Sequence, residues 1–116
     1  NLYRASHINH PSAKWCRHSI HNYKLLFNLW IELMREYNYR YGKIHSSIRL
    51  AKFLKNPPNN ISVNEPFTAT WRAMPDEFKE DRSVENYTIK SYRNYYNGAK
   101  TKMFKWKNRA PPDWIV

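Results

Sequence analysis

Residues 20–42 have the sequence IHNYKLLFNLWIELMREYNYRYG, and the argument for the fold begins with them. Large apolar and aromatic side chains recur every three or four positions, which is typical of one face of an α-helix. Leucines widen that face, so the sequence predicts a long, central and largely buried helix. Gly42 is expected to cap its end, since glycine tolerates positive φ. The recurring residues are Ile20, Tyr23, Phe27, Trp30, Met34, Tyr37 and Tyr41, and the leucines are Leu25, Leu26, Leu29 and Leu33.

Helices are predicted on both sides of this segment. His10-Pro11 is expected to start one, because proline suits the first helical position, and a break is expected near Asn22. Ser46 or Ser47 is expected to cap a short helix, and Ser83 a last long helix that continues to Met103. Residues 61–75 are predicted to form a long ordered loop. The fold class is therefore all-α, a single domain of three or four helices.

Composition limits the possible partners. A chain of 116 residues fits one domain over 1–116, and a net charge of +11 favours an anionic partner. The single Cys16 cannot form an internal disulfide, which predicts an intracellular location in a bacterial cytoplasm or an infected host cell. No segment approaches the ~20 apolar residues of a membrane helix, so no membrane partner is expected. The sequence begins with Asn1 rather than Met, which suggests a further segment upstream.

Residues 90–109, KSYRNYYNGAKTKMFKWKNR, contain seven Lys or Arg and five aromatic residues but no Asp or Glu. Cations attract phosphates and aromatic faces stack on bases, so this mixture predicts a nucleic-acid-binding surface. The alternative is an ordinary core helix with a solvated lysine face. Gly98 is expected where the backbone closely approaches another helix or a phosphate. The predicted binding residues are Tyr92, Arg93, Tyr96, Lys100, Lys102, Lys105 and Lys107.

A second basic cluster lies near the start of the long helix. Lys14 and Arg17 flank Trp15, and residues 1–31 contain no acidic side chain. A helix N-terminus favours anions, so Lys14 and Arg17 are predicted to add to a phosphate site. The alternative is that Trp15 belongs to the core and the two cations only solvate it.

Candidates for catalysis are few. His10 could act as an acid or base near neutral pH, and Glu36 could do the same, although an ion pair with a neighbouring Arg or Lys explains Glu36 equally well. Lys14 and Lys100 are the amines that could form a Schiff base. His7, His10, His18, His21 and Cys16 do not have the spacing of a zinc site, so neither a metal nor a cofactor is expected.

Several motifs resemble a family of small phage and bacterial proteins of unknown biochemistry. They are His10-Pro11 with Trp15 and Arg17, Glu36-Tyr37 with Arg40-Tyr41-Gly42-Lys43, residues 73–79, and the run from Tyr92 to Arg109. That family is more distantly similar to the pyrimidine-dimer DNA glycosylases of phage, which are small, basic and helical. The resemblance implies DNA contacts at residues 92–109. Those enzymes use the α-amino group of the mature chain as nucleophile. Asn1 and the residues that follow it do not match the N-terminal sequence of those enzymes.

The sequence thus predicts a basic DNA-binding protein of phage type, possibly with glycosylase/AP lyase activity in DNA repair. DNA is expected as partner rather than RNA. One alternative is a non-enzymatic factor that binds nucleic acid or another protein. The other is a nucleotide-processing enzyme whose basic face holds a small phosphorylated substrate.

Overall fold

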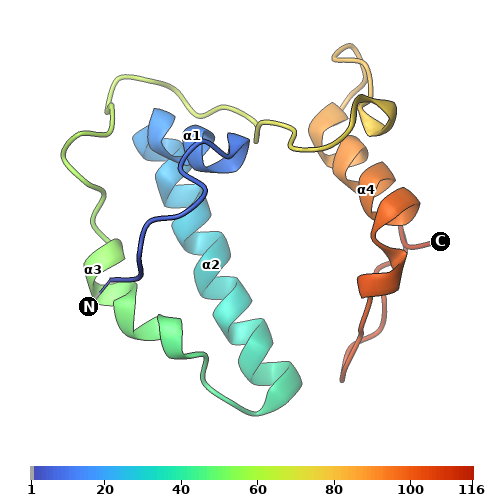
Figure 1. Cartoon of the computed structure of the whole chain (residues 1–116), viewed down its shortest axis with the longest axis horizontal. Coiled ribbons are helices and arrows are strands. Elements are labelled where there is room, and N and C mark those ends of the chain that lie inside the picture. Colours follow the sequence, from blue (N-terminus) through green and yellow to red (C-terminus); the bar gives the residue numbers. More distant parts are fainter. Residues whose placement is uncertain (1) are drawn as a thin grey trace. The chain divides into compact units, whose positions relative to one another are not determined.

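A computed structural model describes residues 2–116, and these contain α-helices and short 3-10 helices but no β-strand, which confirms the all-α prediction. The chain forms two compact units, residues 1–68 and residues 69–116, and each is described by itself (Figure 1). The first unit contains α1 (Pro11–His18), α2 (Ile20–Tyr41), the 3-10 helix η1 (Ser46–Leu50) and α3 (Ala51–Leu54). The second contains η2 (Asp76–Phe78), α4 (Tyr87–Ala99) and η3 (Thr101–Met103).

The corner between α1 and α2 lies at Ser19, three residues before the predicted break near Asn22. Pro11 starts α1 as predicted, and the His10 side chain caps it by accepting a hydrogen bond from the Ser12 N–H. Ser19 is extended, with φ −149°, and its hydroxyl accepts from the His21 N–H and donates to the Glu65 carbonyl. The serine side chain therefore gives a backbone N–H at the start of α2 its hydrogen-bond partner and connects a later loop to the same place.

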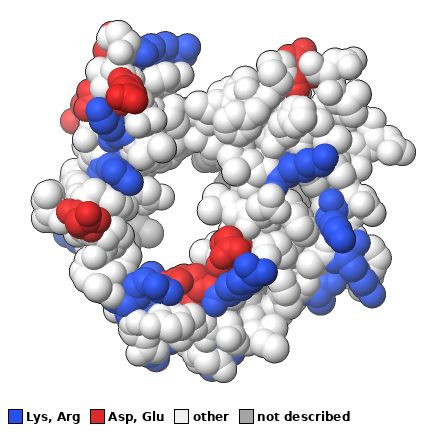
Figure 2. Space-filling model, turned by 180° about the vertical axis from the view of Figure 1, so that it is seen from behind, with Lys and Arg blue, Asp and Glu red and all other residues white. Residues whose placement is uncertain are grey.

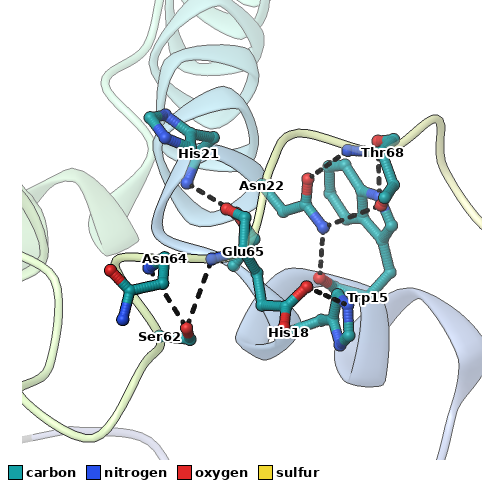
Figure 3. Close-up of polar contacts among 9 residues, drawn as sticks. Trp15, His18, His21, Asn22, Ser62, Asn64, Glu65 and Thr68 are labelled. Atoms are coloured by element: carbon teal, nitrogen blue, oxygen red, sulfur yellow. Dashed lines mark hydrogen bonds and ion pairs between the residues drawn. The ribbon is translucent and has the colours of Figure 1, made fainter.

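The centre of the first unit is a buried pair, Trp15 and Asn22 (Figure 3). The Trp15 Nε1–H donates to the Thr68 carbonyl over 2.9 Å. The Asn22 amide donates to the Trp15 carbonyl and to the Thr68 hydroxyl, and its oxygen accepts from the Thr68 N–H. Buried polar groups need such partners. The middle of the long loop is thus fastened to the α1–α2 corner.

The prediction that α2 is largely buried is wrong. Only Asn22 of this helix is buried, whereas Leu29 is 62% exposed and Leu33 is 58% exposed. The reason is that neighbours cover one side of α2: the Tyr23 hydroxyl donates to the Leu54 carbonyl, and the Tyr37 ring contacts His45. The four leucines remain exposed beside these contacts.

The end of α2 is as predicted, and the start of the next helix is not. Gly42 caps α2 with φ 63°, and its N–H donates to the Asn38 carbonyl. The cap of η1 is His45 rather than Ser46 or Ser47, because the His45 ring nitrogen accepts from the Ser47 N–H.

The last helix is shorter than predicted at both ends. Ser83 does not cap it, since the Ser83 N–H donates to the Asp81 carboxylate in a separate turn. The residue before α4 is Asn86, whose φ is 57°. It ends at Ala99, where Gly98 lowers the helix propensity of the final turn. Lys102 and Trp106 therefore do not continue the stripe of α4.

Gly98 lies against the ring of Phe78, the last residue of the 3-10 helix η2, so of the two predicted close approaches the structure has the one to another helix. A Cβ at this position would overlap the ring of Phe78, which packs on Tyr95 with 5.3 Å between ring centroids. The glycine thus lets η2 lie directly on α4.

We predict that Gly98→Ala destabilises the second unit. Although alanine favours helix, displacing the Phe78 ring costs about 1–3 kcal/mol of unfolding free energy, as overpacking does. Urea denaturation followed by circular dichroism measures the change. In a Phe78→Ala background the same substitution has no ring to displace and should be neutral or stabilising. An equal loss in both backgrounds would contradict this explanation.

Candidate nucleic-acid interface

One face of α4 holds the second unit together. Ser91 is fully buried, and its hydroxyl donates to the Tyr87 carbonyl and accepts from the Glu80 N–H. The hydroxyl of the next residue, Tyr92, donates to the Trp71 carbonyl and accepts from the Ala73 N–H. This inner face fixes residues 71–80 on the helix. The predicted binding residue Tyr92 accordingly uses its hydroxyl inside the unit.

The opposite face of α4 carries Arg93, Tyr96, Asn97 and Lys100. Their spacing of i, i+3, i+4 and i+7 places them in one stripe along the helix. The Tyr96 side chain is exposed, at 42% of its full area. The Lys100 ammonium lies 5.1 Å from the centroid of the Tyr95 ring, where the ring face attracts a cation. Arg93 and the exposed ring of Tyr96 therefore share the outer face, and the Lys100 ammonium lies at its end, over the Tyr95 ring that packs on Phe78.

The C-terminal residues fold back onto this outer face, as the position of Trp114 after Pro111-Pro112 suggests. The Asn97 amide donates to the Trp114 carbonyl over 2.9 Å and accepts from the Val116 N–H. The Trp114 ring then lies beside Tyr96, with centroids 6.4 Å apart, and beneath the guanidinium of Arg93 at 5.4 Å. One asparagine side chain thus positions an aromatic ring against the helix.

The other predicted lysines follow α4 outside regular helix. Lys102 belongs to η3, and Lys105 and Lys107 alternate with the aromatic pair Phe104 and Trp106, whose ring centroids are 5.6 Å apart. All three lysines are exposed. Because this segment has no acidic residue, its local potential is positive.

Five of the six acidic side chains of the same unit lie between Asp76 and Glu85, and the sixth is Asp113. A hydrogen bond from Lys79 lowers the pKa of Asp76, and hydrogen bonds from Ser83 lower the pKa of Asp81. These carboxylates are therefore ionised at neutral pH, and an anionic partner avoids them. On the face shown in Figure 2, Lys and Arg form several separate groups, with Asp and Glu between some of them.

In the first unit, the structure gives the predicted binding residues different roles. Arg17 donates from Nη1 to the Ile8 carbonyl over 2.7 Å, so it fastens the N-terminal residues to α1. Lys14 is exposed on α1, one turn after the capping His10. Lys14 is thus exposed to solvent, whereas Arg17 makes a structural contact.

The catalytic candidates of the first unit are not brought together. α1 crosses the first turns of α2 (Figure 1), whereas Glu36 lies about 24 Å further along the helix axis at 1.5 Å per residue. Glu36 accepts a hydrogen bond from Arg40 Nε over 2.7 Å, the ion pair considered from the sequence. His10 and Lys14 therefore have no carboxylate partner in Glu36.

Cys16 does not supply a nucleophile either. Burial raises the pKa of its thiol above the usual value, with Arg17 acting in the opposite direction, so the thiol is protonated at neutral pH. It lines an apolar cavity of about 350 Å³ together with Tyr23, Leu26, Phe27, Trp30 and Leu54. Within residues 2–116, no three His, Cys, Asp or Glu side chains gather as a metal site would require.

Trp114 and Asn97 are not among the predicted binding residues, although the structure brings both to the outer face of α4. Asn97 lies four residues after Arg93 and one after Tyr96, a spacing that places it on their face, but its partner is a backbone carbonyl far along the chain.

No helix among the described residues has the length and apolar character needed to cross a membrane. No protein-family model, curated protein or solved structure matches the chain.

Proposed function

We propose that this chain is a DNA-binding protein and that its second unit supplies the main binding surface. The observation that supports this most is the outer face of α4 with the segment that follows it. Lys100, Lys102, Lys105 and Lys107 are interspersed with rings there, and residues 90–109 contain seven Lys or Arg but no Asp or Glu. Lys14 and Arg17 of the first unit carry further positive charge.

Phosphate attraction explains why such a surface suits a polymer. Each cation that neutralises a phosphate releases a condensed counterion, and this release favours binding strongly at low salt. A small phosphorylated metabolite offers few phosphates and needs an enclosing polar pocket. In the first unit, a cavity of about 350 Å³ is lined almost entirely by apolar groups, and in another of about 380 Å³ the Arg40 guanidinium pairs with Glu36. The polymer therefore fits the described surfaces better than a nucleotide substrate.

The salt dependence of binding tests this function. For duplex DNA, log Kd should rise with log salt concentration with a slope between about 3 and 6, since each neutralised phosphate contributes about 0.9. Fluorescence anisotropy of a labelled 20-base-pair duplex, titrated between 50 and 300 mM NaCl, measures the slope. A flat dependence together with tight binding of a nucleotide would favour the nucleotide-processing alternative, and no retention at 50 mM would refute DNA binding.

Glycosylase/AP lyase activity, which the family resemblance implies, requires an amine that attacks C1′ of the damaged nucleotide. Lys14 and Lys100 are the candidate amines in the described chain. Borohydride reduction in the presence of abasic DNA traps such a Schiff base as a covalent adduct. An adduct lost in Lys100→Arg or Lys14→Arg would identify the amine, and binding without an adduct would establish a non-enzymatic DNA-binding factor.

A further inference from the structure

We propose that Tyr96, Trp114 and Arg93 form a base-stacking platform and that the chain selects single-stranded DNA over duplex. This inference rests on the proposed DNA-binding function and adds the class of DNA that the surface recognises. The argument uses the geometry of the second unit alone.

The first observation is the exposed ring of Tyr96. The inner face of α4 is occupied by Ser91, Tyr92 and Gly98, which hold residues 71–80, so the Tyr96 ring lies outside that contact and has Trp114 and Tyr95 as its ring neighbours. A tyrosine that is 42% exposed keeps part of a π face available. Stacking on an unpaired base would cover that face.

The second observation is that the neighbouring ring is held in place. Asn97 bonds the backbone on both sides of the tail, at the Trp114 carbonyl and the Val116 N–H. The Trp114 ring therefore stands beside Tyr96 at a 44° interplanar angle without any ligand. A ring already in place loses little conformational entropy when a base stacks on it.

The third observation is the cation above the platform. The Arg93 guanidinium lies over the Trp114 ring, which leaves its N–H edge available for phosphate oxygens. Lys100 lies one turn beyond Tyr96 in the same stripe. Rings for bases are thus flanked along the helix by cations for the backbone. In duplex DNA, base faces are hidden in the stack, so only the cations could bind.

Competition between two DNA forms tests the inference. A labelled (dT)15 and a 15-base-pair duplex are titrated with the full chain at 100 mM NaCl and followed by anisotropy. We expect the single strand to bind at least tenfold more tightly. Tyr96→Ala should weaken single-strand binding by about 5- to 150-fold and leave duplex binding within twofold.

Matched substitutions separate a flat ring from apolar bulk. Tyr96→Phe retains the ring and should bind (dT)15 like the parent, whereas Tyr96→Leu retains apolar area but should behave like alanine. Trp114→Ala should also lower the single-strand preference. Circular dichroism of each variant checks folding, and unfolding of Tyr96→Ala would show that Tyr96 belongs to the core and overturn the inference.

The other outcomes separate the two proposals. Equal affinity for both DNA forms, unchanged by Tyr96→Ala, would overturn the stacking platform while leaving DNA binding intact. Failure to bind either form at 50 mM NaCl would refute the proposed function itself. If Tyr96→Leu and Tyr96→Phe weaken the binding of single strand and duplex by the same factor, the hydroxyl rather than the ring face makes the contact.

Discussion

Replacing Lys100, Lys102, Lys105 and Lys107 together by Glu is expected to abolish retention of DNA while the helix content stays unchanged. Each substitution exchanges an attraction of about 1 kcal/mol in water for a repulsion of similar size. Even with screening by salt, four such changes should lower the affinity by at least about 10³-fold. Anisotropy with a labelled oligonucleotide at 100 mM NaCl measures the loss, and far-ultraviolet circular dichroism measures the helix content.

A matched variant separates this surface from net charge. Lys24, Lys43, Lys52 and Lys55 are exposed in the first unit, so reversing them lowers the net charge from +11 to +3, as the first set does. The control variant loses only long-range attraction and retains the local contacts, so its affinity for DNA should fall far less, by about tenfold or less. Equal losses in both variants would show that binding depends on total charge and that residues 100–107 form no specific surface.

The second large effect is expected for Trp15→Ala, which should unfold or nearly unfold the first unit. Trp15 is 1% exposed, and its indole N–H supports the Thr68 carbonyl. Truncating a buried tryptophan costs about 3–5 kcal/mol, which is comparable to the lower end of the total stability of small proteins. Thermal and urea denaturation followed at several wavelengths would measure the loss.

Two companion variants make the explanation specific. Trp15→Phe keeps most of the buried ring but leaves the Thr68 carbonyl without its donor, so an intermediate loss of about 1–3 kcal/mol is expected. Leu29→Ala, at a side chain that is 62% exposed, should change the stability by less than about 0.5 kcal/mol. A Trp15→Ala protein as stable as Leu29→Ala would contradict the placement of the core.

Local signals predicted some helix ends correctly. Proline at the first position of α1 and glycine after α2 each act through backbone properties that a short segment determines. The predicted cap at Ser83 failed because Asp81, two residues earlier, takes the Ser83 N–H in a turn of its own. Competing local hydrogen bonds of this kind are hard to rank from residue types alone.

Long-range features were less predictable. The apolar stripe of α2 correctly indicated a helix, but periodicity cannot tell how much of a stripe the rest of the chain is able to cover. A break of the helix was expected near Asn22, yet Asn22 is a buried residue that bonds Trp15 and, 46 positions further along the chain, Thr68. For the candidate site, the sequence identified the basic and aromatic residues, while the position of Trp114 depends on Asn97 and a folded tail.

The uncovered leucines of α2 have a consequence for the behaviour of the protein in concentrated solution. Exposed apolar surface of this kind promotes aggregation, and electrostatic repulsion between molecules that each carry a net charge of +11 opposes it. Ionic strength controls the balance, since dissolved salt shortens the range of the repulsion and leaves the attraction between leucines intact. Colloidal stability should therefore decline in the concentrated brines commonly used to strip nucleic acid from basic proteins.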